Sequence, residues 1–346
     1  MSTQASSVPG DSSTLALTLR CLQRYLDDPD VTELCINRPG EAYIETSSGW
    51  RCESLPELSF EWCLRFAKLA ANFTGQRVDS ASPLLSAALP GGERVQCVLP
   101  PATTPGTVAI SIRRPSRRVW SIAEMARNGV FGRVRRAGTV GETHESTLLE
   151  LLAAGEYEAF MSLAVLTRQN ILVSGPTGAG KTTWTRALIR EIPSEERLIT
   201  IEDARELVLD RHPNHVRLFY SKDDQGLARV TPRQLLECCL RMKPDRILLA
   251  ELRSDEAFDY LRNVNSGHPG SITSVHASST SLAFEQLALL IKQSVAGREM
   301  PRSEIRALLH LLIDVVIQFS CRGRQRYIEE IWYEPALKRH GQRGLS

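Results

Sequence analysis

The stretch at residues 175–183 constrains the fold more than any other part of this chain. Its sequence, Gly-Pro-Thr-Gly-Ala-Gly-Lys-Thr-Thr, fills every fixed position of the pattern G-x-x-x-x-G-K-[ST]. The residues before it, 170–173, predict a buried strand, and residues 182–189 after it predict a helix. The chain must therefore accommodate a strand, a tight glycine-rich turn and a helix in direct succession.

This strand–turn–helix unit is suited to phosphate binding. Glycines let backbone N–H groups turn inward, and a helix N-terminus favours anions. Lys181 adds a positive charge for the β- and γ-phosphates, and the hydroxyl of Thr182 is a ligand for Mg²⁺. A flexible turn without a ligand is the alternative, which the regular flanks disfavour. We therefore expect ATP and Mg²⁺ to bind through Gly175, Pro176, Thr177, Gly178, Ala179, Gly180, Lys181, Thr182 and Thr183.

Composition narrows the class of protein. The 346 residues are enough for two domains, and 42% hydrophobic with 24% charged residues is typical of a globular protein. A net charge of +2 does not favour a protein that coats nucleic acid. The eight cysteines include no C-x-x-C pair, so no structural zinc is expected. No signal peptide or membrane-spanning run is expected either, which predicts a cytoplasmic protein.

The pattern of apolar residues predicts two domains joined by a linker. Helices at 15–27 and 60–72, with strands at 31–37, 41–45, 94–99 and 107–113, predict an N-terminal α+β domain over residues 14–115. Residues 116–147 are rich in arginine, glycine and polar residues, and predict a linker with a short helix near 122–126. Polar tails are expected at 1–13 and 339–346.

The second domain, residues 148–338, alternates helix and strand patterns as a parallel α/β sheet does. Strands are expected at 170–174, 197–201, 215–220, 246–250 and 271–275, with helices at about 181–191, 232–241 and 254–265 between them. Helices at 281–295 and 302–311 and closing strands near 313–320 and 326–333 complete it. The expected fold class is therefore α/β, with a mostly parallel sheet and a smaller α+β domain before it.

Carboxylates follow two of these strands. Glu202 and Asp203 end the strand at 197–201, where open α/β sheets bind their ligands, and either is suited to orient or deprotonate an attacking water. Glu251 ends the next apolar strand, but Ala250 occupies the position where nucleotide sites usually carry an aspartate. Glu251 is therefore expected to act through water on Mg²⁺ or as a base. A solvated acidic strand end is the alternative for Glu202, which the nearby nucleotide loop disfavours.

Histidines and arginines supply further candidates. His276, at a strand end, suits a sensor that hydrogen-bonds to the γ-phosphate, whereas a zinc site with His268 lacks a third ligand. For His268 a structural and a functional role remain equally open. Arg94 and Arg113 lie in a basic part of the first domain, where guanidinium groups suit phosphate, although solubility or nucleic-acid binding are alternative uses.

The ordered set of motifs resembles the secretion-superfamily traffic ATPases, and most closely the hexameric ATPases of type IV secretion systems. The resemblance runs from about residue 15 to 335. It is carried by the segments 31–40, 89–96, 111–115, 175–183, 200–203, 247–253 and 267–276. The paired-cysteine module common in type II assembly ATPases is missing from the sequence, and pilus retraction motors are the nearest rival.

The resemblance implies a homohexameric ring in which nucleotide binds between an N-terminal domain and a RecA-like domain. Arg94 and Arg113 match arginines that the N-terminal domain brings to the nucleotide. The positions matching the family's catalytic residues are Lys181, Thr182, Glu202, Glu251 and His276. By resemblance to the pilus motors, Glu202 is favoured as the base and Glu251 as a residue acting on water-bound Mg²⁺.

The resemblance also implies partners and a location. The ring is expected at the cytoplasmic face of the bacterial inner membrane, held there by other inner-membrane components of the secretion system, and its cargo is DNA or protein. Two functions of other classes remain open. A nucleic-acid motor predicts salt-dependent stimulation by DNA. A nucleotide-gated scaffold predicts binding of ATP with little hydrolysis.

Overall fold

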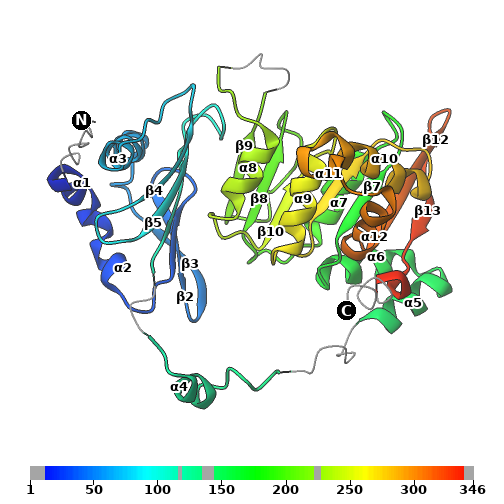
Figure 1. The fold of residues 1–346 in the computed structure, drawn as a ribbon, viewed down its shortest axis with the longest axis horizontal. Helices are drawn as coiled ribbons and strands as arrows, with labels where there is room; N and C mark the ends of the chain where they lie inside the picture. Colours follow the sequence, from blue (N-terminus) through cyan, green and yellow to red (C-terminus); the bar gives the residue numbers. More distant parts are fainter. Residues whose placement is uncertain (1–11, 116–118, 135–143, 222–226, 339–346) are drawn as a thin grey trace, which may run out of the picture.

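The computed structural model describes residues 12–115, 119–134, 144–221 and 227–338, which form a smaller α+β domain and a larger α/β domain (Figure 1). The helices are α1 (Ser12–Leu19), η1 (Arg20–Leu22), α2 (Gln23–Asp27), α3 (Phe60–Phe73), α4 (Ile122–Arg127), α5 (Glu145–Ala154), α6 (Tyr157–Leu166), α7 (Lys181–Arg190), α8 (Pro232–Cys239), α9 (Glu256–Asn265), α10 (Thr280–Gln293), α11 (Val295–Arg298) and α12 (Arg302–Leu312). The strands are β1 (Glu33–Ile36), β2 (Glu41–Thr46), β3 (Gly49–Ser54), β4 (Leu84–Ala88), β5 (Arg94–Val98), β6 (Ala109–Arg113), β7 (Ile171–Ser174), β8 (Leu198–Glu202), β9 (His215–Phe219), β10 (Arg246–Leu249), β11 (Ile272–Val275), β12 (Val315–Arg322) and β13 (Gln325–Trp332).

The N-terminal domain is an antiparallel sheet covered on one face by helices. Its strand order is β3-β2-β1-β6-β5-β4, and α1 and α3 pack against alternate residues such as Leu34, Ile36 and Ile112. Because side chains alternate along a strand, Asn37, Gln96 and neighbouring polar residues lie on the opposite face. That face turns toward the second domain. The sequence patterns did not predict β3 and β4.

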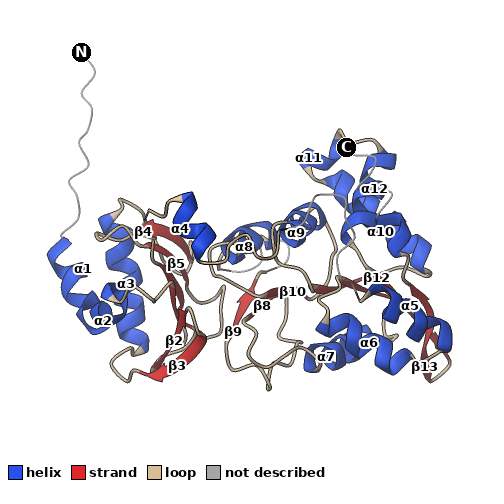
Figure 2. Cartoon of the chain, turned by 90° about the horizontal axis from the view of Figure 1, so that it is seen from below, coloured by secondary structure: helices blue, strands red, loops and turns tan. Residues whose placement is uncertain are grey.

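The second domain confirms the predicted α/β class. Parallel strands in the order β10-β8-β9 continue into β11-β7-β12-β13, in which only β13 is antiparallel. The N–H of Leu252, just after β10, donates to the Ser274 carbonyl of β11 at 2.9 Å and joins the two groups of strands. Helices α8, α9, α10 and α12 cover one face, and α6 and α7 cover the other (Figure 2).

The N-terminal domain packs on the β9 edge of this sheet. The Phe219 N–H donates to the Ala102 carbonyl at 2.9 Å, and the Thr103 hydroxyl donates to the Arg217 carbonyl at 2.8 Å. Val98 and Ala109 belong to the same apolar core as the residues of β8 and α8. The two domains therefore share one packed interface.

A second group of contacts joins the domains at the amino ends of the parallel strands. Arg197, just before β8, is fully buried and donates to the Asn37 side-chain oxygen at 2.8 Å and to the Met242 carbonyl at 3.0 Å. Lys243, just before β10, forms an ion pair with Glu45 at 2.8 Å. These contacts place β1 and β2 beside the amino edge of the sheet, opposite to its carboxyl edge.

The domain limits expected from the sequence remain predictions. Helix α5 begins at Glu145, inside the expected linker 116–147, and α1 begins at Ser12, inside the expected tail 1–13. The expected tail 339–346 and parts of the linker lie outside the described residues. Helix α4 coincides with the expected short helix near 122–126 and buries none of its side chains.

Candidate functional site

The nucleotide loop leads from β7 into α7 at the carboxyl edge of the sheet. Gly178 and Gly180 have φ values of +78° and +101°, which residues with a side chain rarely adopt. Gly175 lies so close to β12 that an added Cβ would be 2.8 Å from the Phe319 carbonyl oxygen. The loop glycines are therefore required by backbone conformation and by close packing, and Lys181 begins the helix.

Lys181 lies in contact with the nucleotide loop and with other residues expected at the site. Its Nζ donates to the carbonyls of Gly175 at 2.7 Å and Pro176 at 3.2 Å, and lies 3.1 Å from His276 Nδ1. Burial lowers the pKa of Lys181, and the nearby charge of Glu251 partly offsets this effect. The ammonium group is thus positioned at the mouth of the loop, where it can exchange these neutral acceptors for phosphate oxygens.

His276 connects the lysine to a carboxylate. Its Nε2 approaches Glu251 Oε1 to 2.6 Å, although the N–H does not align with that oxygen as a hydrogen bond requires. Because Nδ1 faces the lysine ammonium, it must accept, so Nε2 carries the proton. Lys181 at the start of α7, Glu251 just after β10 and His276 just after β11 therefore meet at one point.

Arg253 forms ion pairs with two carboxylates, each of which follows a different strand of the sheet. One side of its guanidinium bonds to Glu251 and the other to Asp203. Glu251 is thereby held between a cation and an imidazole, with its side chain 13% exposed. A carboxylate in this position can accept a proton or a hydrogen bond from a water at the loop.

Glu202 has a different environment from the one that the sequence suggested. It is fully buried, and its Oε2 accepts the backbone N–H groups of Glu206 and Leu207, both at 2.8 Å. Its Oε1 accepts the Thr200 hydroxyl at 2.7 Å and pairs with Arg217 at 3.4 Å. With both oxygens engaged, the carboxylate fixes the turn after β8, and the geometry does not favour it as the base.

Thr182 and Glu206 provide oxygens at the start of α7. The Thr182 hydroxyl lies 3.4 Å from Glu206 Oε2, and Arg186 donates to the Glu206 carbonyl at 2.7 Å. A hydroxyl with carboxylates nearby is a donor set that Mg²⁺ accepts, because this ion prefers oxygen ligands. Thr182, with Glu206 acting through water, therefore fits the expected metal.

Arg94 and Arg113 do not meet the nucleotide loop of their own chain. Both are exposed. In the strand register, Arg94 of β5 lies opposite Arg113 of β6, and Arg113 also lies opposite Glu33 of β1. This end of the N-terminal sheet adjoins the amino edge of the parallel strands, whereas the loop lies at the carboxyl edge. Four strand spacings, or about 19 Å, also separate β9 from β7.

Glu33 beside this pair predicts a pH dependence of stability. Burial raises its pKa to about 7, although Arg113 opposes the shift. The folded state therefore binds the Glu33 proton more strongly than the unfolded state does. The free energy of unfolding that this proton contributes is fully present below about pH 4.5 and is lost as pH rises to about 7. We expect Glu33→Gln to stabilise the protein at pH 8 by about 3 kcal/mol relative to its effect at pH 4. Urea unfolding at both pH values measures this, and an equal effect at both would contradict it.

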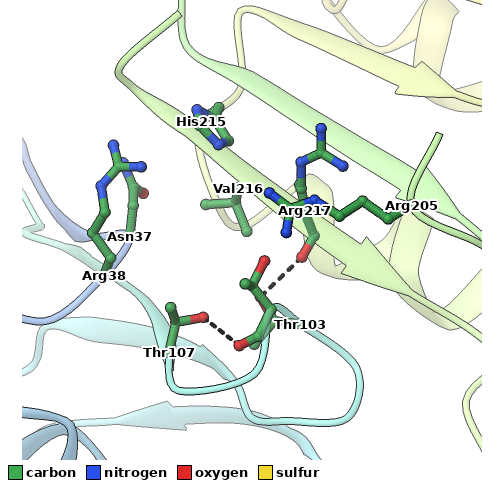
Figure 3. A pocket seen from close by; sticks show the side chains of 9 residues that line it. Asn37, Arg38, Thr103, Thr107, Arg205, His215, Val216 and Arg217 are labelled. Atoms are coloured by element: carbon green, nitrogen blue, oxygen red, sulfur yellow. Dashed lines mark hydrogen bonds between the residues drawn. The ribbon is translucent and has the colours of Figure 1, made fainter. Parts of the chain in front are cut away.

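A small cavity of about 120 Å³ lies at the seam between the domains, lined by Asn37, Arg38, Thr103, Arg205, His215 and Arg217 among others (Figure 3). Burial lowers the pKa of His215 to about 4, so its ring is neutral at ordinary pH. The guanidinium of Arg217 is engaged by Glu202 and by the Leu207 carbonyl. The cavity belongs to the domain interface, and not to the nucleotide loop.

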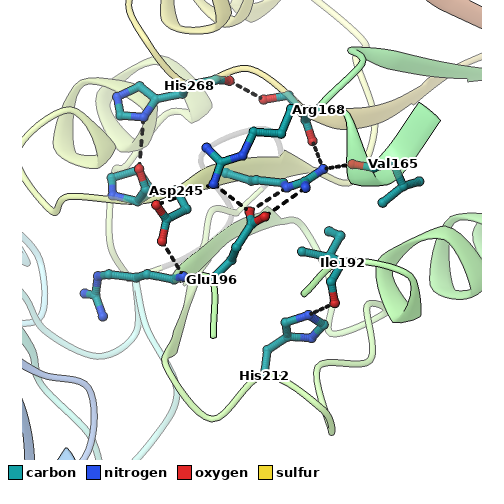
Figure 4. A network of polar contacts seen from close by, with 12 residues as sticks. Val165, Arg168, Ile192, Glu196, His212, Asp245 and His268 are labelled. Atoms are coloured by element: carbon teal, nitrogen blue, oxygen red, sulfur yellow. Dashed lines mark hydrogen bonds and ion pairs between the residues drawn. The ribbon is translucent and has the colours of Figure 1, made fainter. Parts of the chain in front are cut away.

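His268 belongs to a buried polar network at the amino edge (Figure 4). Its Nδ1 contacts the Pro244 carbonyl at 3.0 Å, and burial lowers its pKa. Beside it, the fully buried Arg246 pairs with Glu196 through two bonds of 2.7 and 3.0 Å. The geometry therefore favours the structural role for His268. Sequence reasoning missed Arg246, because nothing in the strand pattern indicates that an arginine is buried.

Comparisons with known proteins agree with this geometry. The family described as Type II/IV secretion system protein matches residues 144–336. The type IV secretion system protein VirB11 of Brucella suis is 46% identical over 326 residues, covering 93% of this chain and 90% of the relative. PtlH of Bordetella pertussis, also named a type IV secretion system protein, is 40% identical, covering 95% of this chain and 98% of the relative.

A solved structure extends the similarity to three dimensions. The crystal structure of the VirB11 ATPase from Brucella suis in complex with sulphate has a TM-score of 0.92 and 44% identity, covering 97% of this chain and 98% of that one. The similarity spans both domains and not the nucleotide loop alone. This chain therefore belongs to the type II/IV secretion system protein family, and within it to the ATPases of type IV secretion systems.

Proposed function

We propose that this chain is a ring-forming, Mg²⁺-dependent ATPase that powers substrate translocation or pilus assembly by a type IV secretion system. The observation that carries the proposal is the meeting of Lys181, His276 and Glu251 at the nucleotide loop. A cation, a hydrogen-bonding imidazole and a carboxylate beside a phosphate-binding loop are the groups that phosphoryl transfer to water requires. The relatives named as type IV secretion proteins support the cellular role.

The roles of the residues follow from their positions. Lys181 neutralises charge on the β- and γ-phosphates, and His276 hydrogen-bonds to the γ-phosphate. Glu251, facing the loop, orients the attacking water and accepts its proton, while Glu202 holds the turn that carries Glu206. Mg²⁺ held by Thr182 would neutralise charge on the phosphates. This assignment moves the base from Glu202, which the sequence favoured, to Glu251, because only Glu251 lies beside Lys181.

We propose further that each nucleotide site is completed by a neighbouring subunit of a homohexamer. Arg94 and Arg113 lie beyond reach of their own loop, so the arginines that clamp the phosphates come from the next N-terminal domain. The linker supports self-association, because it exposes apolar side chains that water disfavours. Those residues are Val119, Ile122, Val130, Phe131 and Val134, each more than half exposed.

A complementation experiment tests the shared site. Co-expression of Lys181→Ala with Arg113→Ala is expected to restore part of the ATP turnover that each variant lacks, because some interfaces in mixed rings join an intact loop to an intact arginine. The double variant Lys181→Ala/Arg113→Ala, co-expressed with Lys181→Ala, is the control and has no intact loop. A mixture as inactive as its parents would contradict the shared site, and the mass of the particle in solution reports the hexamer.

The partners and the location are part of the same proposal. We propose that the ring acts at the cytoplasmic face of the inner membrane, bound to other components of the secretion system, with DNA or protein as cargo. Among the described residues, no helix has the length and apolar character needed to cross a membrane. Turnover that is indifferent to single-stranded DNA is expected. Strong stimulation by DNA would favour a nucleic-acid motor instead.

A further inference from the structure

The β12–β13 hairpin covers one side of the nucleotide loop. Strand β12 lies beside β7, and both run toward the carboxyl edge, so the hairpin turn projects past the loop. The hairpin presents arginines at 322, 324 and 326, all exposed. Of these, Arg326 has a direct contact with the loop, since its Nε donates to the Gly178 carbonyl at 3.0 Å.

Arg326 crosses the loop at two points. Besides the bond to Gly178, its Cδ lies where a Cβ on Gly180 would approach to 3.2 Å. The arginine stem therefore lies over the glycine that immediately precedes α7. Further down the hairpin, Phe319 fills the space beside Gly175. The hairpin thus supports the loop at its beginning, its middle and its end.

The bond to Gly178 has a consequence for phosphate binding. In a trans peptide the C=O and the following N–H point in opposite directions. A guanidinium that holds the Gly178 carbonyl toward the hairpin therefore turns the Ala179 N–H back into the loop, where it donates to the Pro176 carbonyl at 3.3 Å until a phosphate oxygen replaces that acceptor. An N–H directed into the loop is the group that a bound phosphate needs.

We propose that Arg326 is a positioning residue of the nucleotide site, which fixes the Gly178–Ala179 peptide in the orientation that binds phosphate. It acts through the main chain, so the effect of its loss falls on nucleotide affinity and not on the chemical step. The proposal rests on the nucleotide loop being the site of ATP binding. Its test must therefore distinguish a wrong assignment of the nucleotide loop from a wrong assignment of the role of Arg326.

The experiment compares Arg326→Ala, Arg326→Lys and Arg324→Ala in the full chain, with binding of a fluorescent ATP analogue and steady-state hydrolysis as readouts. For Arg326→Ala we expect the dissociation constant and the KM to rise about tenfold, because a charge-assisted hydrogen bond is lost, with kcat within about twofold of the wild type. Arg326→Lys is expected to recover part of the affinity. Arg324→Ala, on the same hairpin, is expected to bind as the wild type does.

Three outcomes would overturn the proposal. Wild-type nucleotide affinity in Arg326→Ala would show that Arg326 does not position the loop. An equal loss of nucleotide affinity in Arg324→Ala would show a general effect of surface charge. A loss of kcat with unchanged KM would place Arg326 in the chemical step. Lys181→Ala, measured alongside, separates the two hypotheses: if it also binds nucleotide normally, the loop assignment fails, whereas loss of binding in Lys181→Ala alone overturns only the role of Arg326.

Discussion

Lys181→Ala is expected to reduce ATP turnover at least about a hundredfold, because it removes the charge that neutralises the β- and γ-phosphates. The fold is expected to survive. The lysine donates to two backbone carbonyls and lies beside the His276 ring, and the nearby Glu251 keeps its ion pair with Arg253, so removal of the lysine leaves no unpaired charge behind. Phosphate release at saturating ATP measures the loss, and a thermal melt reports the fold.

The matched control for this variant is Arg190→Ala. Arg190 lies in the last turn of the same helix, α7, and is exposed, so the change removes one positive charge far from the loop. Its turnover is expected to equal that of the wild type. Hydrolysis by Lys181→Ala at the wild-type rate would show that the loop is not the site of turnover.

The second large effect separates the two glutamates. For Glu251→Gln we expect kcat to fall about 10²–10⁴-fold with little change in stability, because an amide keeps the shape but cannot accept the proton. For Glu202→Gln we expect the free energy of unfolding to fall by about 3–5 kcal/mol, because Arg217 is left buried without its counter-charge. Hydrolysis rates and chemical unfolding of both variants measure the difference.

The opposite result would restore the assignment suggested by the sequence. If Glu202→Gln folds as stably as the wild type but loses kcat, while Glu251→Gln retains it, then Glu202 is the base. Such a result would require the turn at residues 203–207 to release the Glu202 carboxylate when nucleotide binds. Hydrogen exchange of the Glu206 and Leu207 amides, with and without nucleotide, would detect that release.

The carboxyl edge of the sheet was predictable because parallel strands bring their ends together. A strand pattern followed by Lys181, Glu251 or His276 is enough to place all three side chains at that edge, and the structure brings them into contact. Strand order was not predictable in the same way. Nothing local in the sequence indicates that β9 forms the edge on which the N-terminal domain packs.

The surroundings of single side chains were harder to predict. Glu202 ends a strand as a catalytic carboxylate does, but its bonds depend on a turn that folds back onto it. Arg197 is buried because an asparagine from the other domain, Asn37, accepts its hydrogen bond, and this is a contact across 160 residues of sequence. Strand β3 escaped prediction because most of its residues are exposed and lack an apolar pattern.

The bonds between residues 102–103 and β9 have a consequence for the solubility of the isolated parts. Strand β9 is the edge of the large sheet, and the Phe219 N–H is satisfied by Ala102 from the other domain. An uncovered edge strand offers unpaired N–H and C=O groups to other copies and promotes aggregation. The N-terminal domain therefore also shields this edge. A fragment beginning at the linker would expose an aggregation-prone edge strand that the intact chain keeps covered.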